Sequence, residues 1–272
     1  MNDGVDSIPV AALAAALWRH GAPLVLDVRR PADFDALPRL IPAALRRGPD
    51  LVVDEFTPHA RQAIVVYCAH GRAVSQSACR ALREVGIDAV YLEGGYAAWE
   101  AAGLPSTHHA APLGGGPSRW ITRERPKIDR IACPWLIRRF IDPRAEFFYV
   151  PTATVKEEAR RLDAVPYDIP DVDFSHAGER CSFDAFLTHF DLHAPGLDRL
   201  ATIVRGADTA RLDLAPQASG LVAISLGLSA NFTNDHAMLE QGLVIYDALY
   251  AWCRSGLAEG HDWKPQAMEI RA

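Results

Sequence analysis

Apolar residues in the first hundred positions alternate between short continuous runs and helical spacing. Runs of four or five residues, the length of buried strands, lie at residues 24–28, 64–67 and 89–92. Apolar residues recur three and four positions apart, as on one face of a helix, at residues 10–19, 75–85 and 96–102. Strands that alternate with helices favour a parallel sheet covered by helices, so this part is predicted to be α/β.

Helical spacing dominates after residue 118. Short strands are predicted at residues 120–123, 146–150 and 172–175. They are outnumbered by predicted helices at residues 134–141, 154–162, 183–189, 196–204, 217–228 and 235–254. The second part is therefore predicted to be an α-rich α+β domain.

A stretch dense in glycine and proline separates the two patterns. It ends in Gly114-Gly115-Gly116-Pro117, where the glycines follow no predicted strand and open no helix, so they do not predict a phosphate-binding loop. We predict two domains, residues 1–107 and 119–272, joined by a linker at residues 108–118. The length of 272 residues agrees with two domains of about 100 to 200 residues each.

Composition indicates an ordinary globular protein. The chain is 49% hydrophobic and carries 28 Lys and Arg against 34 Asp and Glu, a net charge of −6. Such a chain has no global field for nucleic-acid phosphates, so we expect no nucleic-acid partner. The N-terminus lacks the basic start of a signal peptide, and no apolar run reaches the roughly 20 residues of a bilayer span, so we expect a cytoplasmic protein without a membrane partner. Five cysteines without a Cys-x-x-Cys pair favour reduced thiols.

Cys68 is the first candidate for chemistry. It follows the predicted strand 64–67 directly and precedes a loop that leads into the next predicted helix, for which Ser75 is a suitable N-cap. Backbone N–H groups and the positive end of a helix dipole would then surround the sulfur and favour a thiolate and a bound anion. His70 and Arg72 add positive charge nearby. The alternative is that Cys68 is a small buried hydrophobic residue.

Most of residues 8–106 resemble a single-domain rhodanese. The matching stretches are Leu26-Asp27-Val28-Arg29 with Asp33-Phe34, Ile41-Pro42-Ala43-Ala44, Val66-Tyr67-Cys68-Ala69-His70-Gly71 and Tyr91-Leu92-Glu93-Gly94-Gly95-Tyr96-Ala97-Ala98-Trp99. The resemblance implies sulfurtransferase activity, with Cys68 carrying a persulfide between a donor such as thiosulfate and a nucleophilic acceptor. His70, Gly71 and Arg72 then form the substrate-binding loop.

The sequence departs from the rhodanese pattern in two places. Arg39-Leu40 stands where Gly-His usually precedes Ile-Pro, and Ala73 stands where the loop usually has an arginine. These departures leave another sulfur species, or an oxyanion bound without turnover, as alternatives to thiosulfate.

A basic segment opens the second domain. The cations considered for oxyanion binding are Arg123, Arg125, Lys127 and Arg130. Pro134 suits the first position of a helix, which would place Cys133 at the N-cap beside Arg130 with a lowered pKa, as a further substrate-binding residue. The alternative is a solvated face whose cations pair with Glu124 and Asp129.

Candidate metal ligands are scattered through the second domain. His236 and Glu240 lie one helical turn apart and can face one point, while His176 and Asp208 lie in separate polar segments. Imidazole and carboxylate groups of this kind hold divalent zinc or iron, the cofactor that we consider here. The alternative is that His236 and Glu240 are an exposed helix pair and His176 is hydrogen-bonded in a turn.

Nearly all of residues 119–254 is similar to the chromate resistance (ChrB-type) C-terminal domain. The similarity is carried by residues 120–132, 133–140, 181–186, 203–208, 212–217, 225–231 and 235–253. Members of this family are associated with bacterial chromate resistance, and some are chromate-sensing regulators. The resemblance implies a chromate-resistance protein whose partner is a small inorganic anion, either a thiosulfate-like sulfur donor or chromate.

Two other functions stay open. One is a chromate-responsive transcription regulator, although the sequence has no evident helix-turn-helix and its net charge is acidic. The other is a plain sulfurtransferase whose second domain only presents substrate. The sequence does not indicate an oligomeric state.

Overall fold

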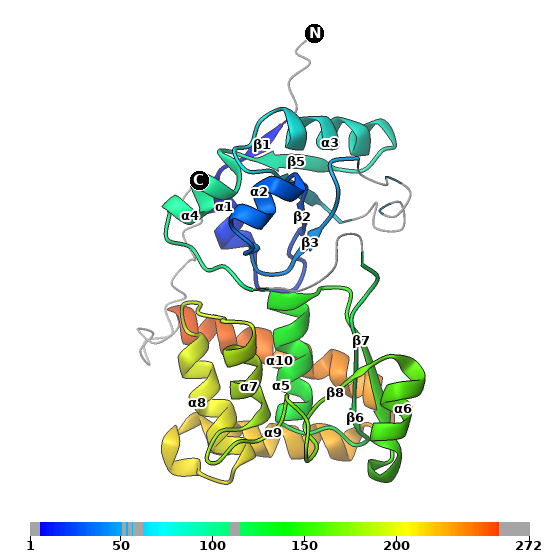
Figure 1. Cartoon of the computed structure of the whole chain (residues 1–272). Coiled ribbons are helices and arrows are strands. Elements are labelled where there is room, and N and C mark those ends of the chain that lie inside the picture. Colours follow the sequence, from blue (N-terminus) through cyan, green and yellow to red (C-terminus); the bar gives the residue numbers. More distant parts are fainter. Residues whose placement is uncertain (1–5, 51–52, 54–55, 57–61, 109–114, 256–272) are drawn as a thin grey trace. The chain divides into compact units, whose positions relative to one another are not determined.

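The computed structural model describes residues 6–50, 53, 56, 62–108 and 115–255 (Figure 1). These residues divide into two compact units. Of the described residues, the first unit includes those up to Gly116 together with Arg139–Pro143, and the second includes Pro117–Arg138 and residues 144–255. Most of the predicted linker, residues 109–114, lies outside the described residues.

The regular elements follow one another along both units. The strands are β1 (Ser7–Ile8), β2 (Leu24–Asp27), β3 (Ala44–Arg46), β4 (Ile64–Tyr67), β5 (Ala89–Leu92), β6 (Arg119–Arg123), β7 (Glu146–Val150) and β8 (Val165–Pro166). The α-helices are α1 (Val10–Ala16), α2 (Pro31–Ala36), α3 (Ala73–Glu84), α4 (Gly95–Ala101), α5 (Asp129–Leu136), α6 (Val155–Leu162), α7 (Ser182–His189), α8 (Leu197–Asp208), α9 (Gln217–Asn231) and α10 (Asp235–Ser255). The described residues also include a π-helical turn (Ile137–Ile141) and two short 3-10 helices (Thr152–Thr154 and Leu212–Leu214).

The first unit is built on a parallel five-stranded sheet with the strand order β1-β5-β4-β2-β3. In its centre, Leu24 lies opposite Ile64 and Asp27 lies opposite Tyr67. Strands β2 and β4 are buried along their whole length, as expected where helices cover a parallel sheet. The predicted α/β fold is confirmed.

One face of this sheet packs against α3, which Figure 1 shows alongside β5. Alternate residues of a strand point to the same side, and here they meet the apolar face of α3. The shared core contains Leu24, Leu26, Ile64, Val66, Ala78, Cys79 and Leu82. Because α3 follows β4 in the chain, it starts at the carboxyl edge of the sheet, where ligands of open parallel sheets usually bind.

The second unit combines a small parallel sheet, in the order β7-β6-β8, with a larger set of helices. Helix α6 packs on the sheet, with Val155 and Ala159 in one core with Ile121. The longest helix, α10, packs along α5, and Ile131 lies against Gly242, where a larger side chain has no room. The predicted helix-rich class is confirmed. None of the helices in the described ranges is both long and apolar enough to cross a bilayer.

Two predicted elements of the second unit are wrong. Residues 172–175 form no strand, since Phe174 makes only an isolated bridge with Tyr167. Helix α5 begins at Asp129, so Pro134 lies inside the helix and Cys133 is not an N-cap. Proline cannot donate to the carbonyl of Arg130, which the hydroxyls of Tyr149 and Tyr167 approach instead, at 3.4 and 3.5 Å.

Candidate functional site

Cys68 is the first residue after β4, at the carboxyl edge of the sheet, and is only 6% exposed. Helix α3 begins at Ala73 with Arg72 as its N-cap, so Ser75 is a first-turn residue and not the predicted cap. The Ser75 hydroxyl lies 3.3 Å from the Cys68 Sγ and 3.1 Å from the carbonyl oxygen of Arg72. The early helix start thus turns Ser75 toward the sulfur.

Hydrogen bonds control the ionisation of Cys68. Burial alone raises the pKa of its thiol, but the hydroxyl and backbone N–H of Ser75 and the backbone N–H groups of Arg72 and His70 act in the opposite direction. The net result is a pKa below that of an ordinary cysteine. Because the thiolate is the nucleophilic form of cysteine, this loop suits nucleophilic sulfur chemistry.

The loop is held against the turn that follows β5. Gly71 has a positive φ of +65°, and a Cβ added there would lie 2.5 Å from the carbonyl oxygen of Leu92. Tyr96 donates its backbone N–H to the Cys68 carbonyl at 2.9 Å. The predicted residues His70, Gly71 and Arg72 thus share one loop with Cys68, and the side chains of His70 and Arg72 are exposed.

A buried polar network supports the strands beneath this loop. The guanidinium of Arg29 pairs with Asp27 at 2.5 Å and donates to the carbonyl oxygens of Leu37 and Arg39 at 3.1 and 2.6 Å. The hydroxyl of Tyr67, the residue before Cys68, donates to the same carboxylate at 3.1 Å. In the sequence, Asp27 and Arg29 are recognisable only as part of the rhodanese-like motif. In the structure they form a buried ion pair that also binds the backbone of the segment after α2.

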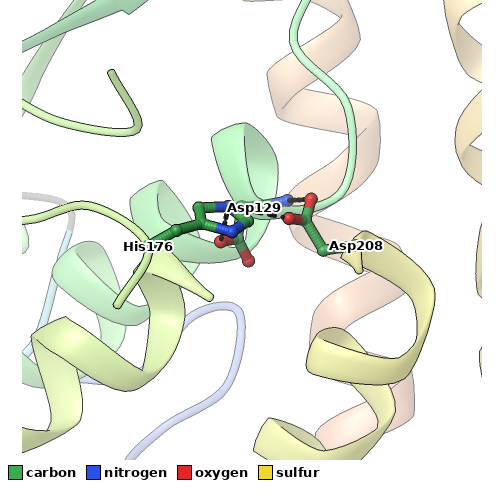
Figure 2. Close-up of side chains that lie close together, drawn as sticks. All are labelled: Asp129, His176 and Asp208. Carbon is green, nitrogen blue, oxygen red and sulfur yellow. Dashed lines mark hydrogen bonds and ion pairs between the residues drawn. The ribbon is translucent and has the colours of Figure 1, made fainter. Parts of the chain in front are cut away.

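In the second unit, Asp129, His176 and Asp208 converge on one point (Figure 2). They come from the first residue of α5, the segment between β8 and α7, and the last residue of α8. Nε2 of His176 lies 3.0 Å from Oδ2 of Asp208 and 3.7 Å from Oδ2 of Asp129. One ligand atom from each residue lies within 4.8 Å of those of the other two. Of the predicted ligands, His176 and Asp208 are therefore brought together.

Asp129 is fully buried, and sequence reasoning did not identify it as a ligand. Its Oδ2 accepts the backbone N–H groups of Ser182 and Phe183 at 2.6 and 3.3 Å, whereas its buried Oδ1 accepts no hydrogen bond from the described residues. Burial, followed by the negative charges of Asp208 and Asp168, raises the pKa of Asp129 well above the usual range. Burial and Asp168 also raise the pKa of Asp208.

A third carboxylate, Asp168, lies 3.4 Å from His176 Nε2 and differs from the other two in having cationic partners. Arg123 and Arg130 pair with it at 2.9 and 3.2 Å. The Ser182 hydroxyl also donates to Asp168, at 2.9 Å. Two cations of the basic segment thus neutralise Asp168.

The other two cations of the basic segment are placed differently. Arg125 donates to the carbonyl oxygen of Phe232 at 2.6 Å and to that of Ser229, which ties it to the end of α9. Lys127 is half-buried. Oxyanion binding by this segment stays a prediction.

Cys133 is fully buried inside α5. Burial, and then the charges of Asp129 and Asp168, raise the pKa of its thiol well above the usual value, so the expected lowered pKa is wrong. A buried protonated thiol is a poor nucleophile.

His236 and Glu240 do not belong to the cluster of Asp129, His176 and Asp208, the one group of this kind in the described part of the chain. The His236 ring lies edge-on to Tyr149 with 5.5 Å between ring centroids. The Glu240 carboxylate pairs with Arg138 at 2.7 Å. Their role as metal ligands stays a prediction.

A hollow of about 590 Å³ adjoins the residues that follow His176 and Asp208. Its lining includes Arg180, Arg205 and Arg211. Arg205 pairs with Asp184 at 2.5 Å and Arg211 with Asp213 at 3.0 Å. The exposed side chain of Arg180 makes no hydrogen bond or ion pair with the described residues. The hollow therefore contains one cation without an acidic partner there.

Comparisons with known proteins match the two units separately. Residues 10–102 match the rhodanese-like domain, and residues 120–253 match the C-terminal domain of ChrB. Over 135 residues the chain is 37% identical to Protein ChrB of Cupriavidus metallidurans. This alignment covers 48% of the chain and 40% of that protein, so the chain spans less than half of this curated relative.

Solved structures are similar to part of the chain. The thiosulfate sulfurtransferase of Pseudomonas aeruginosa is 25% identical with a TM-score of 0.36, over 42% of this chain and 21% of that one. A rhodanese-related protein of Thermoplasma volcanium is 28% identical with a TM-score of 0.30, over 37% of this chain and 96% of that one. By the two domain matches, the chain joins a rhodanese-like domain, residues 10–102, to a ChrB C-terminal domain, residues 120–253.

Proposed function

We propose that this is a chromate-resistance protein whose rhodanese-like domain transfers sulfur through a persulfide on Cys68. The match to the ChrB C-terminal domain supports the first part of the proposal. The second part rests on one observation, the set of hydrogen-bond donors that lowers the pKa of Cys68 at the end of β4.

The first half-reaction is attack of the Cys68 thiolate on the sulfane sulfur of a donor. With thiosulfate, a bond forms between Sγ and the sulfane sulfur, the S–S bond of the donor breaks, and sulfite leaves with the bonding electron pair. The product is a persulfide with a negative terminal sulfur. The N–H groups of the loop offer that charge fixed donors, as an oxyanion hole does.

The second half-reaction returns the enzyme to its starting state. A nucleophile such as cyanide or a thiolate attacks the terminal sulfur, and Cys68 leaves as a thiolate with the electrons of the broken S–S bond. A lowered pKa makes the Cys68 thiolate a better leaving group in this step. The protein undergoes no net oxidation or reduction over the cycle.

The loop departs from the usual rhodanese pattern at one residue that affects the choice of sulfur donor. Ala73 supplies no side-chain donor at the position where the resemblance expects an arginine. A dianionic donor such as thiosulfate therefore meets one charge-assisted contact fewer, and such contacts are about twice as strong as neutral ones. We expect a low-molecular-weight persulfide to be a better donor than thiosulfate.

Cyanide-dependent release of thiocyanate tests the sulfur transfer. We expect turnover with glutathione persulfide, slower turnover with thiosulfate, and none with Cys68→Ala. Cys79→Ala is the matched control, because Cys79 is buried on α3 in the same unit and burial raises its pKa to about 12. Activity of Cys68→Ala equal to that of the wild type would exclude the persulfide cycle.

The anion-binding part of the proposal is best supported at Arg180. Chromate is a tetrahedral dianion, like sulfate, and a guanidinium that has no acidic partner among the described residues can bind such an anion without first losing an ion pair. Titration calorimetry with sulfate and chromate should show weaker binding in Arg180→Gln and unchanged binding in Arg119→Gln, whose exposed side chain pairs with Glu146. Loss of binding in Lys127→Gln alone would place the anion at the basic segment instead.

A further inference from the structure

We infer that Asp129, His176 and Asp208 bind one divalent transition-metal ion in the second unit. The inference does not depend on the sulfur chemistry of Cys68. It rests on the convergence of three donor side chains, on a buried carboxylate oxygen without a hydrogen-bond donor, and on access from solvent.

The three side chains are close to the arrangement that a metal needs. A metal at about 2.0 to 2.2 Å from each ligand holds those ligand atoms about 3 to 3.5 Å apart. His176 Nε2 already lies 3.0 Å from Oδ2 of Asp208 and 3.7 Å from Oδ2 of Asp129. All three ligand atoms lie within 4.8 Å of one another, so loading requires only a small closure.

One oxygen of the Asp129 carboxylate has no hydrogen-bond partner among the described residues. Buried polar atoms in proteins almost always have a hydrogen-bond partner, and a buried carboxylate that lacks a counter-charge is costly. Oδ2 of Asp129 is fixed by the first N–H groups of α7, while Oδ1 is buried without a donor among the described residues. A bound cation would satisfy this oxygen.

The nearby arginines do not take the place of that cation. Arg123 and Arg130 both pair with Asp168, and within the described residues no lysine or arginine forms an ion pair with Asp129 or Asp208. Asp168 is thus neutralised by arginine side chains. For Asp129 and Asp208, His176 is the one basic side chain among the described residues within ion-pair distance. A divalent ion would supply the positive charge that these two carboxylates lack.

An ion can reach this cluster through His176. The imidazole side chain is 41% exposed, although Asp129 beneath it is buried. Ala177 and Thr209, which follow His176 and Asp208 in the chain, line the hollow that contains Arg180. A site reached through one exposed ligand can exchange its ion with solvent.

The donor set indicates the class of metal. Mg²⁺ and Ca²⁺ are usually held by oxygen ligands alone, whereas imidazole suits zinc, iron and their neighbours in the first transition row. Three protein ligands also leave a coordination position open, as in catalytic zinc sites. We therefore expect Zn²⁺ or Fe²⁺ to bind and Mg²⁺ to bind much more weakly.

Binding of Zn²⁺ to the untagged full-length protein, measured by calorimetry after chelator treatment, tests the site. One equivalent should bind per chain, and His176→Gln and Asp208→Asn should each weaken binding more than the 10- to 100-fold that loss of an outer-sphere partner costs. His193→Gln is the matched control, because His193 lies 3.1 Å from Asp191 in an exposed pair. It should retain the wild-type affinity.

Thermal unfolding provides a second measurement that includes Asp129→Asn, a change that also alters a helix cap. Zn²⁺ should raise the Tm of the wild type and of His193→Gln, because a ligand stabilises the state that binds it. It should not raise the Tm of the three cluster variants. Wild-type protein that binds no Zn²⁺, wild-type affinity in both His176→Gln and Asp208→Asn, or loss of binding only in His236→Gln or Glu240→Gln would overturn the inference.

Discussion

The Oδ2 atom of Asp129 accepts the backbone N–H of Ser182 at 2.6 Å, which joins the first residue of α5 to the first residue of α7. The first N–H groups of a helix have no partner within that helix, so Asp129 supplies a capping acceptor from a different element. The same contact fixes the carboxylate beside His176. Local helix capping and the geometry of the cluster of Asp129, His176 and Asp208 thus depend on one side chain.

Ser75→Ala should make Cys68 less reactive near neutral pH. The Ser75 hydroxyl is the strongest of the groups that lower the Cys68 pKa, so its removal raises that pKa and reduces the thiolate fraction. A hydrogen bond worth about 1 kcal/mol corresponds to a roughly fivefold slower alkylation at pH 7. Ser77→Ala, an exposed position on the same helix, should leave the rate unchanged, and an equal loss in both variants would contradict this role of Ser75.

Gly71→Ala should destabilise the Cys68 loop more than Gly86→Ala. Both glycines have a positive φ, which costs a residue with a side chain about 1–2 kcal/mol. Only at Gly71 would the new Cβ also collide with backbone atoms, because nothing lies within 4 Å of a Cβ at Gly86. Urea unfolding and thiocyanate release should both show the larger effect for Gly71→Ala. Equal effects of the two substitutions would mean that the loop accommodates the new Cβ at Gly71 without loss of stability.

Asp27→Asn should strongly destabilise the first unit. It would leave the buried guanidinium of Arg29 without its carboxylate, and breaking a buried pair in this way costs about 3–5 kcal/mol. Asp6→Asn removes an exposed pair of similar length, Asp6 with Arg83 at 2.9 Å, and should have a much smaller effect. The midpoints of urea unfolding compare the two, and similar shifts would argue against a structural role for the buried pair.

Alkylation of the native protein at pH 8 should modify one cysteine of five. The pKa of Cys68 lies below the ordinary cysteine value, so its thiolate is populated and its reactivity falls only as the pH drops through that lowered pKa. Burial raises the pKa of Cys79 to about 12 and that of Cys253 to about 11, and it also raises those of Cys133 and Cys181. Peptide mass spectrometry after short labelling should find the adduct on Cys68 alone, and all five residues should be labelled after unfolding.

Much of the first unit follows from local sequence. The apolar runs of β2, β4 and β5 were predicted within one residue of their ends, because a continuous apolar run is a local property. Strands β1 and β3, of two and three residues, are too short to show a pattern. The loop around Cys68 was also predictable, since the sulfur and its donors lie within one short segment.

The cluster of Asp129, His176 and Asp208 was only partly predictable, because its members meet through tertiary packing. Asp129 and Asp208 are 79 positions apart in the sequence. The spacing of His236 and Glu240 correctly puts both on α10, but helical spacing does not reveal which groups that helix contacts. The start of α5 was missed because Pro134 is an ordinary N-terminal signal, and the tyrosine hydroxyls that approach the freed carbonyl come from β7 and from the residue after β8.

A persulfide on Cys68 can be detected by mass spectrometry of the full-length protein after exposure to glutathione persulfide. We expect one added sulfur atom on the peptide that contains Cys68, its loss on treatment with cyanide, and its absence in Cys68→Ala. An unmodified Cys68, or a sulfur adduct that cyanide does not remove, would rule out sulfur transfer through this residue.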